Sequence, residues 1–156
     1  MTAAELVAKL LDHGVMVATA ESCTGGMVAA AITDVAGSSA VFDRGFVTYS
    51  NEAKNELIGV PMKLINEHGA VSEEVARAMA KGALAHSQAT LAIAVTGIAG
   101  PSGGSKEKPV GLVHFCCAST TGYTWHEQLV FSGDRAAVRN AACDHALQML
   151  GNALSG

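Results

Sequence analysis

The chain has 156 residues, of which 49% are hydrophobic and 15% charged, and its formal net charge is −4. This length predicts a single domain over residues 1–156, and the apolar content excludes an intrinsically disordered chain. The acidic balance argues against a protein that binds nucleic acid mainly by neutralising phosphates. No apolar run reaches the ~18 residues that span a bilayer. The first 15 residues lack the basic region of a secretory signal, so we expect neither a membrane segment nor export.

Cysteine and histidine spacing adds two further expectations. The four cysteines form no C-x-x-C pair, and we expect reduced thiols in a cytoplasmic protein. Two of them are adjacent, and they are predicted to face opposite sides of a strand. The six histidines show no metal-ligand spacing, so we expect neither a zinc site nor catalytic histidines.

The first half of the chain alternates helical and extended patterns. A capping box at Thr2 and Glu5 opens a helix that Gly14 ends. The segments expected after it are a buried strand over 15–20, a short helix over 27–33, a loop at 37–39, a strand over 42–50, and helical turns over 51–57 and after Pro61.

The second half predicts helix, three strands, and helix. Ser72 is expected to cap a helix that buries Val75, Met79 and Ala83. The expected segments after it are a strand over 90–95, a glycine-rich loop over 97–109, and a hairpin of strands 110–118 and 123–131. Asp134 is expected to cap the last helix, whose buried face would carry Val138, Ala142, His145 and Met149. This mixture predicts an α/β fold, namely a three-layer α/β/α domain with a mixed sheet.

The first candidate for chemistry is Ser22, in the turn between a buried strand and a short helix. Free N–H groups of Thr24, Gly25 and Gly26 at a helix start would form a site for an anion or an oxyanion beside the hydroxyl. The simpler interpretation is that Ser22 only caps the helix.

Tyr49 and Lys54 form the second candidate. A lysine in the first turn of a helix faces the positive end of the macrodipole, which lowers its pKa toward a neutral amine. A neutral lysine with a nearby tyrosine activates serine without any histidine in Ser–Lys hydrolases. The alternative is a solvated lysine and an edge tyrosine.

Two further candidates would hold a ligand rather than react with it. Thr96 and Gly97 end a strand and begin the glycine-rich loop, whose N–H groups would suit a phosphate or carboxylate unless the loop is a plain connection. Arg135 and Arg139 lie in the first turns of the last helix, an unfavourable place for cations. Phosphate recognition would explain them, as would a salt bridge to Asp134 or another acid.

These motifs, in this order, resemble the CinA C-terminal domain family. The resemblance rests on Thr19-Ala-Glu-Ser22-Cys-Thr-Gly-Gly26, on Gly45-Phe-Val-Thr-Tyr49-Ser-Asn-Glu-Ala-Lys54 and on Gly69-Ala-Val-Ser72, and continues with Thr96-Gly-Ile-Ala-Gly-Pro101, Lys108-Pro-Val-Gly111 and Phe131-Ser-Gly-Asp-Arg135. It covers about residues 5–150. The chain is similar to single-domain members, without the additional N-terminal domain of two-domain members.

The resemblance implies deamidation of nicotinamide mononucleotide to nicotinic acid mononucleotide and ammonia, and a place in pyridine-nucleotide salvage. Carried over by motif, Ser22 would be the nucleophile, and Tyr49 and Lys54 its activating partners. Thr96 and Arg135 would lie around the same pocket. The resemblance also implies a homodimer. The chemistry needs no metal or organic cofactor.

Two other hypotheses remain at this stage. The glycine-rich turns would equally serve a nucleotide-binding or regulatory module without catalysis, because phosphate-binding loops do not require a reaction. Cys23 is a rival nucleophile, since a helix N-terminus lowers a thiol pKa.

Overall fold

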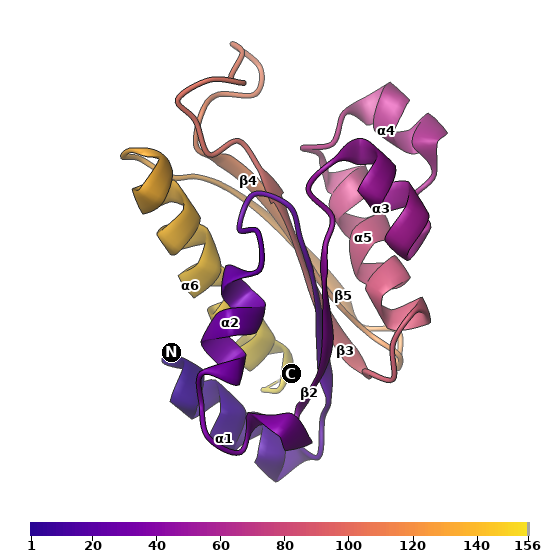
Figure 1. Cartoon of the computed structure of the whole chain (residues 1–156), viewed down its shortest axis with the longest axis vertical. Coiled ribbons are helices and arrows are strands. Elements are labelled where there is room, and N and C mark those ends of the chain that lie inside the picture. The colour runs from indigo at the N-terminus through magenta and orange to yellow at the C-terminus, as the bar shows by residue number, and fades with distance from the viewer. Residues whose placement is uncertain (156) are drawn as a thin grey trace.

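The computed structural model describes residues 1–155, which fold around a five-stranded sheet with helices on both faces (Figure 1). The helices and strands follow the predicted order. The strands are β1 (Val17–Glu21), β2 (Phe42–Val47), β3 (Leu91–Gly97), β4 (Leu112–Ser119) and β5 (Thr124–Val130). The helices are α1 (Ala3–His13), α2 (Met27–Thr33), α3 (Asn51–Ile58), α4 (Met62–His68), α5 (Glu73–Ala85) and α6 (Arg135–Ala153), and a 3₁₀ turn spans Ser38–Ala40.

The sheet is mixed, as predicted, and its strand order is β2-β1-β3-β4-β5. Strands β2, β1 and β3 run parallel, whereas β4 lies antiparallel between β3 and β5. The connection from β1 to β2 passes through α2 on one face, and the connection from β2 to β3 passes through α3, α4 and α5 on the other. In open sheets, ligands bind beyond the carboxyl ends of strands where neighbouring connections leave to opposite faces.

The two faces of the sheet are packed differently. Helices α1, α2 and α6 cover one face, where Leu6, Val28 and Val138 of the helices pack with Ile93 of β3 and Phe115 of β4. The other face is largely alanine, and α5 packs on it with alanines of its own: Ala18, Ala20, Ala92 and Ala94 from the strands, and Ala76, Ala80 and Ala83 from α5. The adjacent Cys116 and Cys117 divide between the two cores, which confirms the prediction that they face opposite ways.

The predicted helix caps are confirmed. Thr2 and Glu5 form the capping box of α1, and Gly14 ends that helix with a φ of 62°. The side chains of Ser72 and Asp134 accept hydrogen bonds from the amides three residues later, as N-caps do.

Four predicted strand ends are wrong by two or three residues, and one of them is the start of the strand expected over 110–118, which begins at Leu112. The strand expected over 42–50 ends at Val47, because the chain then turns to bring Ser50 into place as the N-cap of α3. The strand expected over 15–20 runs over Val17–Glu21 instead, where its residues pair with both neighbours. The strand expected over 90–95 continues to Gly97, which still pairs with Val113 of β4.

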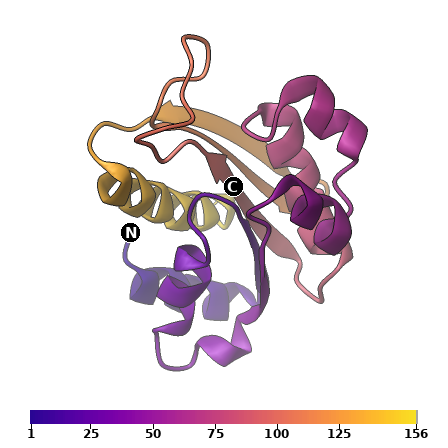
Figure 2. The same cartoon turned by 45° about the horizontal axis from the view of Figure 1, so that its top comes forward.

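The connection between β3 and β4, residues 98–111, projects beyond the carboxyl ends of the parallel strands (Figures 1 and 2). It crosses the same end of the sheet as the turn after β1 and the turn after β2. The three segments that carried the candidate residues are therefore neighbours in space.

Candidate active site

A cavity of about 310 Å³ lies at the carboxyl ends of β1, β2 and β3. It is lined by Ser22, Cys23, Tyr49, Lys54, Ala70, Val71, Thr96, Gly97, Ile98, Ala99, Gly100, Ser102, Gly103 and Arg135. The structure thus brings together Ser22, Tyr49, Lys54, Thr96, Gly97 and Arg135, which the sequence had singled out separately. None of the described residues that line it is acidic.

Ser22 stands directly after β1, in a turn closed by a hydrogen bond from the Gly25 N–H to the Ser22 carbonyl at 3.1 Å. Its own N–H donates to the Val95 carbonyl of β3 at 2.9 Å, which fixes the start of the turn to the sheet. The side chain is 8% exposed and faces the cavity. The hydroxyl makes no cap of α2, whose N-cap is Gly26 and has no side-chain bond.

The amino end of α2 already holds a carboxylate. Glu21, the last residue of β1, is 1% exposed, and its oxygens accept from the Val28 N–H at 2.8 Å and the Ala29 N–H at 3.0 Å. The Thr24 hydroxyl donates to the same carboxylate at 2.7 Å. This role of Glu21 was not predicted from the sequence, although a carboxylate at the end of an apolar strand is a visible signal.

Lys54 is buried beside Ser22. Its side chain is 1% exposed, and Nζ lies 3.0 Å from Ser22 Oγ. Nζ also donates to the carbonyls of Thr48 at 2.8 Å and of Tyr49 at 3.3 Å. Lys54 is in ion-pair distance of no carboxylate among residues 1–155.

Burial of the Lys54 amine without a counter-ion lowers its pKa from 10.5 to about 8. The predicted direction of the shift is confirmed, and its cause is desolvation of the amine by burial. The contacts suit the neutral amine. Because the Thr48 and Tyr49 carbonyls accept its two N–H groups, the remaining lone pair of a neutral amine faces Ser22 Oγ. This arrangement makes Lys54 able to accept the serine proton.

Tyr49 meets Lys54 through its backbone and not through its phenol. The phenol side chain is 60% exposed at the mouth of the cavity, where its hydroxyl accepts from Arg135 Nη2 at 3.1 Å. Arg135 Nη1 donates to the Gly100 carbonyl at 2.8 Å. The pair therefore joins the turn after β2 to the glycine-rich loop and to the start of α6.

Thr96 and Gly97 form the wall of the cavity contributed by β3. The Thr96 hydroxyl donates to the Ala70 carbonyl at 2.9 Å. A Cβ on Gly97 would lie 2.7 Å from Val113 Cγ2 and 3.1 Å from Cys23 Sγ, so position 97 has no room for a side chain. The backbone of Gly97 therefore packs closely against the Val113 and Cys23 side chains.

Thr24, Gly25 and Gly26 follow Ser22 but do not line the cavity. The Gly25 N–H is used inside the turn, whereas the Thr24 and Gly26 N–H groups have no hydrogen-bond partner in residues 1–155. Within α2, the Met27 N–H donates to the Thr24 carbonyl, and the Val28 and Ala29 N–H groups donate to Glu21. The helix N-terminus therefore differs from the open anion site that the sequence suggested.

Cys23 is a poor nucleophile in this environment. Its side chain is 5% exposed, and burial raises the pKa of the thiol to about 11. The expectation that a helix N-terminus lowers this pKa is wrong, because desolvation outweighs the nearby charges. The thiol is protonated at neutral pH, which argues against a cysteine hydrolase.

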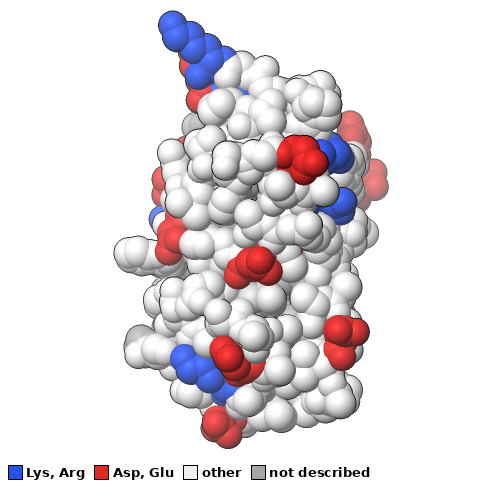
Figure 3. Space-filling model, turned by 90° about the vertical axis from the view of Figure 1, so that its left-hand side faces the viewer, with Lys and Arg blue, Asp and Glu red and all other residues white. Residues whose placement is uncertain are grey.

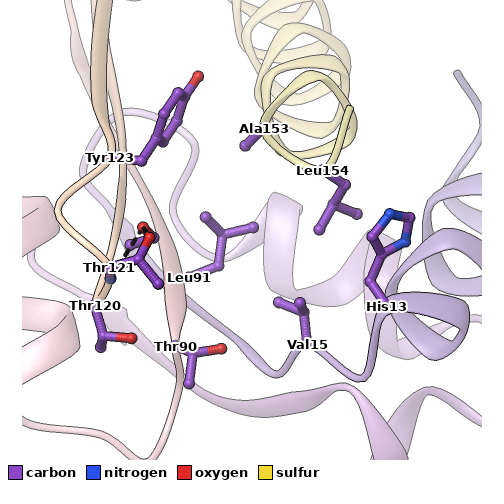
Figure 4. A pocket seen from close by; sticks show the side chains of 10 residues that line it. His13, Val15, Thr90, Leu91, Thr120, Thr121, Tyr123, Ala153 and Leu154 are labelled. Carbon is purple, nitrogen blue, oxygen red and sulfur yellow. Dashed lines mark hydrogen bonds between the residues drawn. The ribbon is translucent and has the colours of Figure 1, made fainter. Parts of the chain in front are cut away.

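Other surfaces offer less chemistry. A hollow of about 290 Å³ at the opposite end of the sheet has no lysine, arginine or carboxylate in its described lining (Figure 4). It is lined by apolar side chains together with His13, Tyr123 and the hydroxyl residues Thr90, Ser119, Thr120 and Thr121. The face seen in Figure 3 carries scattered charges of both signs rather than a continuous basic patch. Residues 1–155 contain no cluster of three metal-ligating side chains and no helix apolar and long enough to span a bilayer.

Comparison with known proteins agrees with the motifs and the fold. The family model of the CinA C-terminal domain matches residues 1–154. The chain belongs to the CinA C-terminal domain family. Among solved members, the competence/damage inducible protein CihA from Agrobacterium tumefaciens superposes with a TM-score of 0.95 at 49% identity, over 99% of this chain and 93% of that one.

Curated CinA relatives are of two lengths. The nicotinamide-nucleotide amidohydrolase PncC of Escherichia coli strain K12 is 57% identical over 141 residues, which cover 90% of this chain and 86% of that protein. A CinA-like protein of Citrifermentans bemidjiense is 56% identical over 141 residues, but the match covers only 34% of its length. The chain thus spans about a third of the longer CinA relatives and most of the shorter ones.

Proposed function

We propose that this chain is an amidohydrolase that converts nicotinamide mononucleotide and water to nicotinic acid mononucleotide and ammonia. The observation that carries the proposal is the buried Lys54 amine, 3.0 Å from Ser22 Oγ inside a cavity at the carboxyl ends of the parallel strands. The name and near-complete coverage of the PncC relatives support this choice of substrate.

In the proposed reaction, Ser22 Oγ attacks the carboxamide carbon while neutral Lys54 takes the hydroxyl proton directly. The tetrahedral intermediate collapses, its C–N bond breaks, and the ammonium of Lys54 returns the proton so that ammonia leaves. Water then attacks the acyl-serine, gives a proton to Lys54, and releases the carboxylic acid as Ser22 recovers that proton. The cycle needs no metal or organic cofactor.

Tyr49 has two parts in this scheme. Its carbonyl and the carbonyl of Thr48 hold the Lys54 amine with its lone pair toward Ser22. Its phenol, tied to Arg135, forms the mouth of the cavity and contacts the substrate. The direct Lys54 route is favoured over a relay through the phenol because the phenol makes no contact with Lys54 or Ser22.

The predicted oxyanion site is the turn after Ser22, which borders the cavity through Ser22 and Cys23; among residues 1–155 the N–H groups of Thr24 and Gly26 have no hydrogen-bond partner, and Gly25 supplies the tight turn. Thr96 and Gly97 form the wall against which the carboxamide lies. Arg135 lies at the mouth of the cavity beside the Tyr49 phenol, and we assign the substrate phosphate to it.

Cavity size and charge support a mononucleotide substrate. A volume of about 310 Å³ is at the lower end of the roughly 300–1,000 Å³ typical of small-molecule sites, which suits a mononucleotide better than a dinucleotide. The described lining carries Lys54 and Arg135 but no acid, so an anionic substrate meets no like charge there.

We further propose a homodimer that works in the cytoplasm, in pyridine-nucleotide salvage. Support for self-association comes from the edge strand β5, where Trp125 and Val130 are 54% and 61% exposed. The four free cysteines suit a reducing compartment. Sedimentation of the protein and of a Val130→Lys variant tests the dimer, and a monomeric parent protein contradicts it.

The test of the activity uses protein treated with a chelator, nicotinamide mononucleotide as substrate, and ammonia as the readout. The parent and an exposed-serine control, Ser39→Ala, are expected to release ammonia, whereas Ser22→Ala is not. Binding of the nucleotide by calorimetry without ammonia release would instead favour a non-catalytic binding module. Full activity in Ser22→Ala would remove Ser22 from the mechanism.

A further inference from the structure

Helix α6 begins with two arginines one turn apart, Arg135 and Arg139. Cations at a helix start oppose the macrodipole, and like charges at positions i and i+4 cost about 0.2–0.5 kcal/mol. The salt bridge suggested by the sequence is absent, since neither arginine pairs with a carboxylate in the described part of the chain. Asp134 instead caps the helix through the Ala137 N–H. Both guanidinium groups instead bind main-chain carbonyls, and Arg135 also binds the Tyr49 hydroxyl.

Arg139 binds the turn that carries Ser22. Its Nε donates to the Cys23 carbonyl at 2.9 Å, and its Nη2 lies 3.3 Å from the Thr24 carbonyl. These residues are more than a hundred positions apart in the sequence. The rigid planar guanidinium thus fixes two successive carbonyl groups from one side.

Fixing a carbonyl also fixes the N–H of the same planar peptide, which points the opposite way. The Cys23 carbonyl shares its peptide with the Thr24 N–H, so that N–H faces away from Arg139. The Thr24 carbonyl shares its peptide with the Gly25 N–H, which donates back to the Ser22 carbonyl at 3.1 Å. The 23–24 and 24–25 peptides are consequently each held in one orientation.

Gly25 makes this contact possible. Its φ of 56° lies in the left-handed region that favours glycine. A Cβ at this position would lie 3.3 Å from Arg139 Nη2, tighter than ordinary packing. The turn is therefore shaped for a guanidinium to approach it closely.

We propose that Arg139 is a positioning residue: by binding the Cys23 and Thr24 carbonyls, it holds the turn in the conformation that orients Ser22 Oγ for attack. The inference rests on the proposed serine amidase chemistry. Arg139 does not line the cavity, so it acts through the turn and not on the substrate. A misplacement of about 1 Å costs about 10²-fold in rate.

The test compares Arg139→Gln and Arg139→Lys with the parent. Arg77→Gln is the matched control, because Arg77 also makes hydrogen bonds to two residues, here the side chains of Glu73 and Thr124, but to none of the site. We expect kcat for ammonia release to fall about 10²-fold in Arg139→Gln, in keeping with a displaced nucleophile, while KM stays within about threefold. Arg139→Lys keeps the charge and is expected to recover part of the loss.

Labelling of Ser22 by a fluorophosphonate separates positioning from folding and does not depend on the choice of substrate. A positioning role predicts that all Arg139→Gln molecules become labelled, but at a uniformly lower rate. A smaller fraction labelled at the parent rate would mean misfolding and overturn the proposal, as would a kcat within threefold of the parent or a change in KM alone. A parent that is labelled but releases no ammonia refutes the proposed substrate, while slow labelling of Arg139→Gln still supports this inference.

Discussion

The neutral form of Lys54 should control the rate, and its titration is the sharpest prediction of the structure. Burial lowers the pKa of this amine from 10.5 to about 8. Because each pKa unit is a factor of ten in the equilibrium, the neutral fraction at pH 7 rises about 300-fold over that of a solvated lysine. The base is deprotonated above its pKa, so activity must rise with pH and not fall.

We expect kcat/KM for ammonia release to increase about tenfold per pH unit below pH 8 and to level off above it, since this ratio reports the ionisation of the free enzyme. Rates measured from about pH 6.5 to 9.5 avoid most of the titration of the substrate phosphate, whose second pKa is near 6. Stopped assays of ammonia at low substrate concentration give the ratio directly.

Lys54→Arg supplies the matching perturbation, because a guanidinium stays charged throughout this range. Loss of a positioned base predicts a fall of about 10²–10⁴-fold in kcat. Lys63→Arg is the control, as Lys63 is solvent-exposed on α4. A pH profile that is flat between 6.5 and 9.5, or a Lys54→Arg enzyme with a tenth of the parent activity, would falsify the assignment of Lys54 as the base.

Three further substitutions test the surroundings of the site. Glu21→Gln removes the charge that two amides of α2 bind, and should lower the free energy of unfolding by about 1.5–3 kcal/mol in urea titrations; an unchanged midpoint contradicts this role. Gly82→Ala places a methyl group against the Ile58 carbonyl and should lower the free energy of unfolding by about 1–3 kcal/mol. An unaltered Tm in calorimetry would contradict this expectation. Cys23→Ala should retain ammonia release to within a few-fold, because the thiol is buried and protonated. An inactive Cys23→Ala variant together with an active Ser22→Ala variant would identify Cys23 as the nucleophile.

Local signals in the sequence predict most elements of this fold. The helix over Met27–Thr33 has the bounds expected from the glycines before it, and the caps at Thr2, Ser72 and Asp134 are visible as residue types. Strand ends were harder to predict, since they depend on pairing. Gly97 belongs to β3 only because β4 returns beside it.

The site was predictable as a set of segments but not as a geometry. Ser22 and Lys54 stood out by their positions after strands, and the carboxyl ends of parallel strands meet at one edge. That Lys54 is buried depends on how α3 lies over this edge, and no local pattern encodes that packing. The contacts of Arg139 join α6 to the turn after β1, a long-range pairing that residue type alone does not reveal.

The two fixed partners of the Lys54 amine besides Ser22 are main-chain oxygens, from Thr48 and Tyr49. Every amino acid supplies such an oxygen, so alanine scanning at Thr48 deletes a hydroxyl and leaves the lysine partner in place. A mutational screen would therefore record position 48 as tolerant even though its carbonyl aims the base. The orientation of the Lys54 amine therefore depends on the backbone conformation between β2 and α3. Insertions or deletions in this segment should reduce activity more than substitutions do.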